Sequence, residues 1–308
     1  MKKTLFFLMV MAAVLTGCSN ENTNELVRGN AIEFDGFVNK STRGTVDLDN
    51  QTLNNFTVYG FMESAGGVIF DNEPVVKAES GAWTYTHKQY WNPGNAYYFS
   101  AIAPTVDAQW TYDTNDTTDG GIITYTNGEG NQDLIYAYTK TRYNMASASP
   151  KVGFNFYHLL SRVAFSFTNG FENPNITLNV TGVTIKNAVN KASIDMADPT
   201  NGWTALDDEV ALDFGDTKFQ RIEIGATSST DHKYMIPLAK DYELEFTVEM
   251  YQGTELAGTF VHTVSIPHLN MLSNTSYKVQ AELSATNINP AAELEEIQFE
   301  VSDLKQWD

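Results

Sequence analysis

The residues between Val152 and Thr168 constrain the fold of this chain more than any other stretch. Their sequence, VGFNFYHLLSRVAFSFT, holds two runs in which apolar and polar side chains alternate. The apolar residues that share one face are Phe154 and Phe156 in the first run and Val163, Phe165 and Phe167 in the second. A period of two is typical of a half-buried β-strand. Because a His-Leu-Leu-Ser break separates the runs near mid-chain, we interpret the stretch as the end of one β-domain and the start of another.

Strand-like segments recur along the chain, and no segment keeps a helical period. The segments that we expect to be strands are Ala31–Val38, Phe56–Met62, Tyr97–Ala103, Ile122–Tyr125, Leu134–Tyr138, Ile176–Val180, Val183–Ile185, Ile222–Ile224, Glu243–Met250, Phe260–Ile266, Tyr277–Leu283 and Ile297–Val301. One short helix is expected at Asn289–Glu293, where a capping residue precedes proline. Many short strands separated by turns predict an all-β fold built of β-sandwiches.

Charge and cysteine content narrow the classes of function. The formal net charge is −19, and a chain this acidic repels phosphate, so nucleic acid is not an expected partner. The chain contains one cysteine, Cys18, which excludes a disulfide framework and a cysteine-based zinc site. With 308 residues, the chain is long enough for two domains that each bury a core.

The N-terminus resembles a bacterial lipoprotein signal. Met1–Lys3 is basic, and the following apolar run is shorter than the ~20 residues that span a bilayer. The sequence Leu15-Thr-Gly-Cys18 resembles a lipobox, in which cleavage before the cysteine leaves a thiol that carries lipid. We therefore expect residues 1–17 to be a signal peptide and Cys18 to be lipidated, with several acyl chains as an anchor. The alternative is an ordinary secretory signal with an incidental cysteine.

Several spaced aromatic and turn residues resemble those of fimbrillins, the lipoprotein-derived subunits of type V pili. These are an early F-x-x-x-V strand, F-T-V-Y-G-F at Phe56–Phe61, Y-W-N-P-G-N-A-Y-Y-F-S-A at Tyr90–Ala101 and F-x-F-x-H-L-L-S-R-V at Phe154–Val163. The resemblance covers nearly the whole chain after the signal peptide. It implies two transthyretin-like β-sandwich domains in tandem, expected at residues 45–157 and 158–308, preceded by a tether and a removable first strand at residues 18–44.

The resemblance also implies assembly by strand exchange at the outer membrane and cell surface. An Arg-specific protease removes the N-terminal strand, and the opened groove accepts a strand from another pilus subunit. Arg43–Gly44 is the candidate cleavage site, because it follows the strand at Ile32–Val38; Arg28–Gly29 is a second candidate that would leave this strand in place. The alternative is that both arginines are ordinary solvated loop residues.

The candidate donor strand is the C-terminal segment, residues 294–307. The side chains that would fill pockets in a neighbouring subunit are Ile297, Phe299, Val301 and Trp307. The same alternation is equally typical of the last strand of the chain's own domain. Sequence therefore leaves both interpretations open, and it does not separate a stalk subunit from a tip or an anchor.

Enzymatic function is not expected. The five histidines form no close ligand pair, a lipidated cysteine is no nucleophile, and the loop at Asp113–Gly121 lacks the closing glutamate of a calcium site. We expect no cofactor, metal or catalytic residue. The second hypothesis is a surface lipoprotein that binds host or bacterial glycans through exposed aromatic residues, for which the candidates are Trp83, Tyr90, Trp91 and Trp110. For Trp91, which flanks a turn, core packing is the preferred interpretation.

Overall fold

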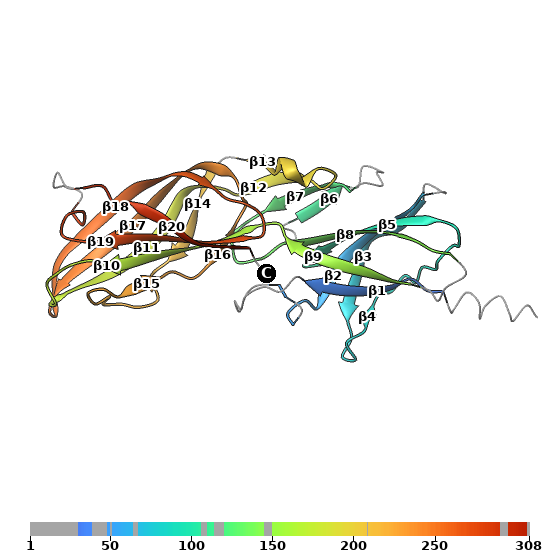
Figure 1. Ribbon diagram of the computed structural model, residues 1–308, viewed down its shortest axis with the longest axis horizontal. Coiled ribbons are helices and arrows are strands. Elements are labelled where there is room, and N and C mark those ends of the chain that lie inside the picture. The colour runs from blue at the N-terminus through green and yellow to red at the C-terminus, as the bar shows by residue number, and fades with distance from the viewer. Residues whose placement is uncertain are drawn as a thin grey trace, which may run out of the picture.

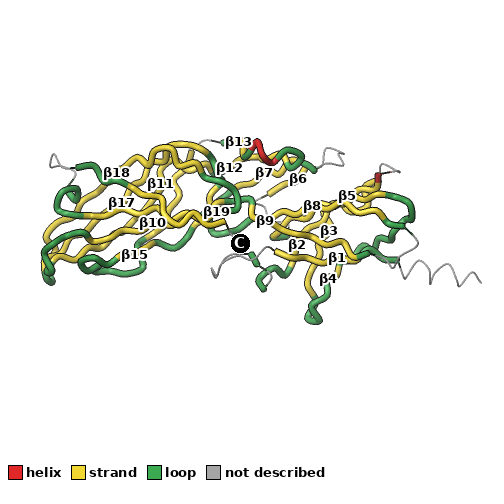
Figure 2. Tube along the Cα trace, viewed as in Figure 1, coloured by secondary structure: helices red, strands yellow, loops and turns green. Residues whose placement is uncertain are grey.

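The structure is a computed structural model that describes residues 30–38, 48–49, 51–63, 67–105, 110–113, 120–144, 150–207, 209–289 and 295–306. Cys18, Arg28–Gly29, Arg43–Gly44 and Trp307 lie outside the described residues, as does most of the predicted helix at 289–293. The described chain is elongated and nearly all β, with strands of the two sequence halves at opposite ends (Figure 1). Figure 2 shows strand along most of its length. The predicted all-β fold is confirmed.

The half of the chain before residue 160 builds most of one end of the molecule. Its strands are β1 (Glu33–Val38), β2 (Asn55–Met62), β3 (Gly67–Lys77), β4 (Trp83–Thr84), β5 (Ala96–Ala103), β6 (Trp110–Asp113), β7 (Ile122–Thr126), β8 (Ile135–Arg142) and β9 (Lys151–His158). Seven of them form a sheet in the order β1-β9-β8-β5-β2-β3-β4. The register joins β8 to β9 only at Ile135↔His158 and Tyr136↔Tyr157. Beyond this junction, β9 and β1 lie over the aromatic core that β2 and β5 also line.

The half after residue 160 forms two further sheets that pack face to face. Its strands are β10 (Ser161–Asn169), β11 (Ile176–Val189), β12 (Lys191–Asp195), β13 (Trp203–Ala205), β14 (Glu209–Gly215), β15 (Thr227–Ser229), β16 (Lys233–Met235), β17 (Ala239–Gln252), β18 (Glu255–Asn270), β19 (Thr275–Leu283) and β20 (Phe299–Gln306). One sheet has the order β15-β10-β19-β20, with β16 also paired to β10, and the other has the order β14-β11-β17-β18. Their facing side chains enclose a second core, which includes Phe165, Phe167 and Phe246.

A small sheet joins the two halves. Its order is β13-β12-β7-β6, so strands from before and after residue 157 pair directly, from Lys191↔Thr126 to Asp195↔Ile122. A third core lies beneath it and takes residues from both halves, among them Tyr136 and Trp203. The Trp203 indole also donates a 3.0 Å hydrogen bond to the Leu159 carbonyl. The domain boundary expected between residues 157 and 158 remains a prediction. Residues on the two sides of that position share this sheet and the core beneath it.

Two expectations about individual strands are wrong. The segment Ile222–Ile224 is not a strand, because only Ile222 bridges to Leu178 before a turn begins. The strand β10 is not half-buried: Arg162, Ala164 and Ser166 are buried as well as the apolar face. The reason is that β10 is a central strand, with β19 on one side and β15 and β16 on the other.

Candidate functional site

The N-terminal strand β1 is the feature of the fold that most directly bears on function. It pairs with β9 in parallel, from Glu33↔Lys151 to Val38↔Phe156. Its alternation places Ile32 and Phe34 inside, at 1% and 3% exposure, while Glu33 and Asp35 remain exposed. The Glu33–Lys151 ion pair at 3.5 Å is largely solvated on both sides, so it adds little to stability. The strand is therefore held by its backbone ladder and by the buried side chains of Ile32 and Phe34.

Phe34 occupies the centre of an aromatic cluster. Its ring lies 5.3–6.4 Å, centroid to centroid, from the rings of Phe56, Phe70, Tyr85, Phe99 and Phe154. Such edge-to-face and stacked pairs stabilise beyond the area they bury. These partners come from β2, β3, β5, β9 and the segment after β4. Removal of Phe34 would therefore open a hole that several elements share.

The segment between β4 and β5 closes over the other side of β1. The Ile32 amide donates to the Gln89 carbonyl at 2.9 Å, and the Trp91 amide donates to the Asn30 carbonyl at 2.9 Å. The Tyr85 hydroxyl donates to the Ile32 carbonyl at 2.7 Å. The start of β1 is thus bonded on both sides, to β9 and to residues 85–91.

A buried glutamate on β3 fixes the start of this covering segment. The Glu73 carboxylate accepts the Thr86 and His87 amides at 2.9 and 3.0 Å and meets the His87 imidazole at 2.7 Å. Burial by itself would raise the pKa of Glu73, but the hydrogen bonds from His87 and Thr86 hold it below the ordinary glutamate value. The clamp is consequently made by the ionised carboxylate.

A buried pair of polar side chains, Asp133 and His158, fixes the chain at Leu48. Asp133 and His158 are joined at 2.7 Å with both side chains fully buried. The same aspartate accepts the Leu134 amide at 2.8 Å and the Leu48 amide at 3.2 Å. His158 is therefore a hydrogen-bonded structural residue. The contact with Leu48 holds the first described residue after β1.

The candidate donor segment lies on its own sheet in this structure. The strand β20 runs antiparallel to β19 at the edge of the sheet, with Ala281↔Phe299 and Val279↔Val301 in register. Ile297 is buried at 4% exposure, and Phe299 packs against Phe167 and Phe246 at centroid distances of 6.1 and 6.2 Å. Val301 is 39% exposed. The C-terminal segment is thus the last strand of its own sheet, one of the two interpretations that the sequence leaves open.

A sequence correspondence between the two terminal strands is missed when each is considered alone. Ile32-Glu33-Phe34-Asp35 and Ile297-Gln298-Phe299-Glu300 share the order isoleucine, polar, phenylalanine, acidic. In both, the isoleucine and phenylalanine face inward, since alternate residues of a strand share a face. The signal needed to find it is a comparison of the chain's first strand with its last.

The aromatic candidates for glycan stacking divide into two groups. Trp91 and Trp110 are buried at 4% and 5% exposure and have no free face for a sugar, which confirms the core interpretation for Trp91 and corrects the expectation for Trp110. Trp83 is half-buried and forms a 4.7 Å ring contact with Phe56. Tyr90 is 40% exposed. Of the four candidates, only Trp83 and Tyr90 therefore keep surface that a sugar could reach.

The described residues contain no group of three or more metal-ligating side chains. Along the same part of the chain, no helix has the length and apolar character needed to cross a bilayer. The candidate site is therefore β1 together with β9 and residues 85–91, which bond to it from its two sides. Its chemistry is backbone pairing between strands and burial of apolar side chains.

The chain matches the fimbrillin-like family over residues 42–303 and belongs to that family. No functionally curated protein shows significant similarity to it.

Solved structures share the fold at low sequence identity. A fimbrial protein from Bacteroides vulgatus is 16% identical, with a TM-score of 0.67 over 91% of this chain and 100% of its own. Structures described as candidate cell adhesion proteins from Bacteroides ovatus and Bacteroides uniformis are 16% and 15% identical. Both have a TM-score of 0.52 over 90% of this chain and 98% of their own.

Proposed function

We propose that this protein is a structural subunit of a cell-surface fimbria, assembled by proteolytic removal of β1 and insertion of a neighbour's strand. The observation that carries the proposal is the position of β1. It supplies Phe34 to the middle of a core, yet only residues 39–47 connect it covalently to the rest of the described fold. Arg43 lies in that linker, so a cut there turns β1 into a separate peptide.

Loss of β1 supplies the driving force for polymerisation. It leaves the β9 backbone without its ladder partner from Lys151 to Phe156, and an unpaired strand edge is a template for another strand. It also opens the positions of Ile32 and Phe34, and burying side chains of this size stabilises by about 1.5–3 kcal/mol each. An incoming strand with matching apolar residues restores both the backbone hydrogen bonds of β9 and the buried apolar contacts.

The donor that fits these requirements is the C-terminal segment of a neighbouring subunit. Ile297 and Phe299 have the spacing of Ile32 and Phe34, so one registration places them in the two emptied positions. The donor would run parallel to β9, as β1 does. Val301 would follow at the position of Gly36, with Trp307 beyond it as a terminal plug.

The lipoprotein signal gives this scheme its starting point. Lipid on Cys18 would hold the precursor at the outer membrane until cleavage after Arg43 frees the body of the subunit from both anchor and β1. Cleavage after Arg28 would release the anchor and leave β1 in place, which gives a soluble but closed subunit. A stalk or tip subunit needs the first cut, and an anchor needs neither.

The experiment is limited digestion with an Arg-specific protease, followed by intact-mass measurement and native-gel sizing. It uses the chain that starts at Cys18, since the proposal assigns residues 1–17 to the signal peptide. We expect one early cut after Arg43, followed by a ladder of oligomers. Arg43→Gln should abolish the ladder, whereas the matched control Arg28→Gln should retain it.

Two results would contradict the proposal. One is a clean cut after Arg43 that leaves a stable monomer with β1 still bound. The other is a ladder that forms equally well in the Arg43→Gln variant. Monomers that retain saturable binding to glycans would favour the alternative of a glycan-binding surface lipoprotein.

A further inference from the structure

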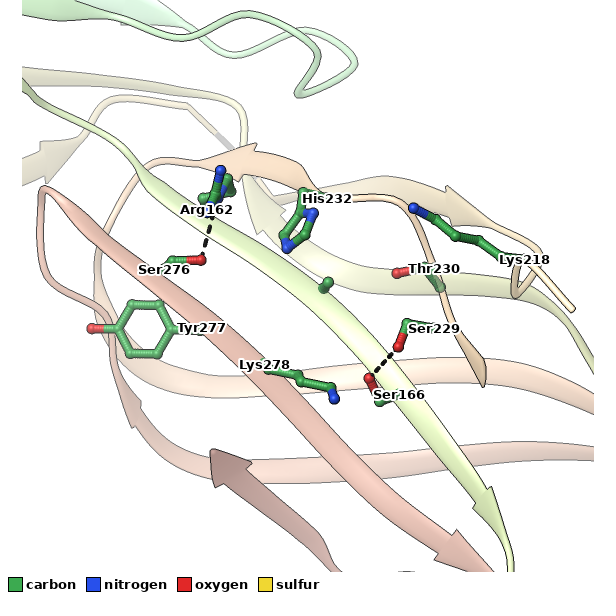
Figure 3. Close-up of a pocket in the computed structure, with 10 residues that line it drawn as sticks. Arg162, Ser166, Lys218, Ser229, Thr230, His232, Ser276, Tyr277 and Lys278 are labelled. Carbon is green, nitrogen blue, oxygen red and sulfur yellow. Dashed lines mark hydrogen bonds between the residues drawn. The ribbon is translucent and has the colours of Figure 1, made fainter. Parts of the chain in front are cut away.

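A pocket on the outer face of the C-terminal half lies apart from the β1 site. It has a volume of about 260 Å³ and lies over β10, flanked by β19 and by residues near β15 (Figure 3). Ala164 and Ser166 on β10 form its buried floor, and the exposed side chains of Lys218 and His232 stand at its rim. The Ala164 side chain is smaller than those of Arg162 and Ser166, its neighbours on the same face of β10. This difference leaves space at the centre of the pocket.

The pocket gathers basic groups in a chain that is strongly acidic. Against a net charge of −19, the basic residues that line it are Arg162, Lys218, His232 and Lys278. None of its described lining residues is acidic. Figure 3 shows Lys278 extending from β19 toward Ser166 and Lys218 approaching from the opposite side. A concave surface with this concentration of one charge favours a ligand of the opposite charge.

The lining is held in place by contacts among its own residues. The Arg162 Nε donates to the Ser276 hydroxyl at 3.2 Å, and the Ser166 and Ser229 hydroxyls share a 2.6 Å hydrogen bond. The Thr230 hydroxyl accepts the Phe165 amide at 3.1 Å. A fixed lining loses less conformational entropy when a ligand binds.

One carboxylate stands just outside the lining. Asp231 pairs with Lys218 at 2.7 Å, with both side chains largely exposed. The hydrogen bond from Lys218 and the attraction of Lys218, His232 and Lys233 keep the pKa of Asp231 below its ordinary value, although burial opposes the shift. Asp231 therefore offsets part of the Lys218 charge at the edge of the pocket, where solvent also screens it most, and it leaves Arg162 and Lys278 as the cations of the interior.

We propose that this pocket binds a single-ring acidic saccharide, one that carries a carboxylate or a sulfate. Arg162 and Lys278 would contact the anionic group, and the hydroxyls of Ser166, Ser229 and Ser276 would pair with the sugar hydroxyls. The pocket volume of about 260 Å³ suits one ring and is below the usual range for drug-sized ligands. A protein partner fits less well, because protein interfaces are broad and enriched in aromatic residues, whereas this pocket is small and lined by hydroxyls.

The inference goes beyond the proposed function, since it assigns a ligand class to a surface that strand exchange does not use. It also differs from stacking on Trp83 or Tyr90, which lie in the other half of the chain. A subunit that failed to polymerise could still bind the saccharide, and a polymerising subunit could fail to bind it.

The test is isothermal titration of the purified, uncleaved protein with glucuronic acid and with a sulfated N-acetylglucosamine. Each is compared with its uncharged counterpart, glucose or N-acetylglucosamine. We expect saturable binding of the two acidic sugars that weakens as salt is added, and about tenfold weaker binding in Lys278→Gln, the loss of one charge-assisted contact. Lys186→Gln, on β11, removes the same charge outside the pocket and should bind like the unaltered protein.

The proposal is overturned if the neutral sugars bind as tightly as the acidic ones, or if neither acidic sugar binds. It is also overturned if Lys186→Gln weakens binding as much as Lys278→Gln does. A chain that ignores the sugars but self-associates in a salt-dependent and Lys278-dependent way would assign the pocket to a carboxylate of a second copy. Equal thermal unfolding midpoints for the two variants establish that the comparison is between folded proteins.

Discussion

The first and last strands of the described chain carry the same side-chain pattern in different surroundings. In β1, Phe34 is 3% exposed, inside a cluster of aromatic rings that several elements contribute. In β20, Phe299 is only partly buried and packs against Phe167 and Phe246. Both are terminal strands at a sheet edge. A phenylalanine side chain that moved from the site of Phe299 to the site of Phe34 would therefore become more buried and would contact more aromatic rings.

If subunits assemble as proposed, this difference gives strand exchange a direction. A subunit that has lost β1 offers the deeper site, and β20 of a neighbour leaves the shallower one. Pairing geometry differs too, because β1 is parallel to β9 while β20 is antiparallel to β19. A donor must therefore leave one sheet completely before it enters another, so the exchange requires unpairing of β20.

The largest expected effect comes from truncating the two phenylalanines. Phe34→Ala should lower the free energy of unfolding of the uncleaved chain by about 3–5 kcal/mol, the usual cost of an aromatic cavity in a core. Phe299→Ala should cost about 1–2 kcal/mol, since less apolar area is lost. Urea denaturation of both variants measures the difference. Equal losses would remove the contrast between the two sites.

The next effect tests the clamp that holds residues 85–91 over β1. Glu73→Ala leaves the Thr86 and His87 amides without their acceptor and should cost about 2 kcal/mol. Hydrogen exchange at Ile32 should accelerate while exchange in β20 stays unchanged. Faster exchange in both strands would mean that the clamp stabilises the whole molecule and not β1 in particular.

The same clamp predicts a dependence on pH. The pKa of Glu73 is lowered in the folded state, so the folded chain favours the ionised carboxylate. Its contribution to stability is complete above the ordinary glutamate pKa of about 4.3 and is lost as the pH falls below it. Glu73→Gln keeps an acceptor oxygen but cannot ionise, so unfolding curves between about pH 5 and pH 3 should fall less steeply for this variant. Identical slopes would contradict the assignment.

Local alternation was sufficient to predict most strands, because burial of one strand face leaves a period of two in the sequence. It predicted β1, β2, β5, β9 and β17 close to their observed positions. It also placed the Phe154 and Phe165 faces in cores. It missed β3. In that strand Asn72 adopts a positive φ of 55° and the pairing with β2 shifts register, so the alternation of apolar and polar residues is interrupted.

Pairing between distant segments could not be predicted in the same way. The β7–β12 ladder joins residues about seventy positions apart, and alternation says which face is buried but not which strand lies alongside. The pocket over β10 was missed for the same reason, since Arg162, Lys218 and Lys278 meet only through the sheet order. The position of β1 was within reach of sequence, because Ile32 and Phe34 alternate with Glu33 and Asp35; whether β1 is removed stays a prediction.

A smaller effect tests the register in which a donor would replace β1. A Cβ added at Gly36 would meet Phe56 and Trp83 at 3.4 Å, and this is the position that Val301 would take. Gly36→Val should cost about 1 kcal/mol, near the low end for overpacking, because the half-buried Trp83 ring can move. A loss as large as that of Phe34→Ala would mean that valine does not fit there, and the proposed register would be wrong.

The smallest effect on stability should have the largest consequence for assembly. Val301 is 39% exposed on β20, so Val301→Asp should change the free energy of unfolding by no more than about 0.5 kcal/mol, as is usual for surface positions. In the β1 site of a neighbour the same aspartate would lie against Phe56 and Trp83, where an unpaired charge is costly. The variant should fold normally, be cut after Arg43 at the normal rate and form a weaker oligomer ladder on native gels. A ladder of normal strength would show that Val301 does not enter a buried site, and β20 would then be only the last strand of its own sheet.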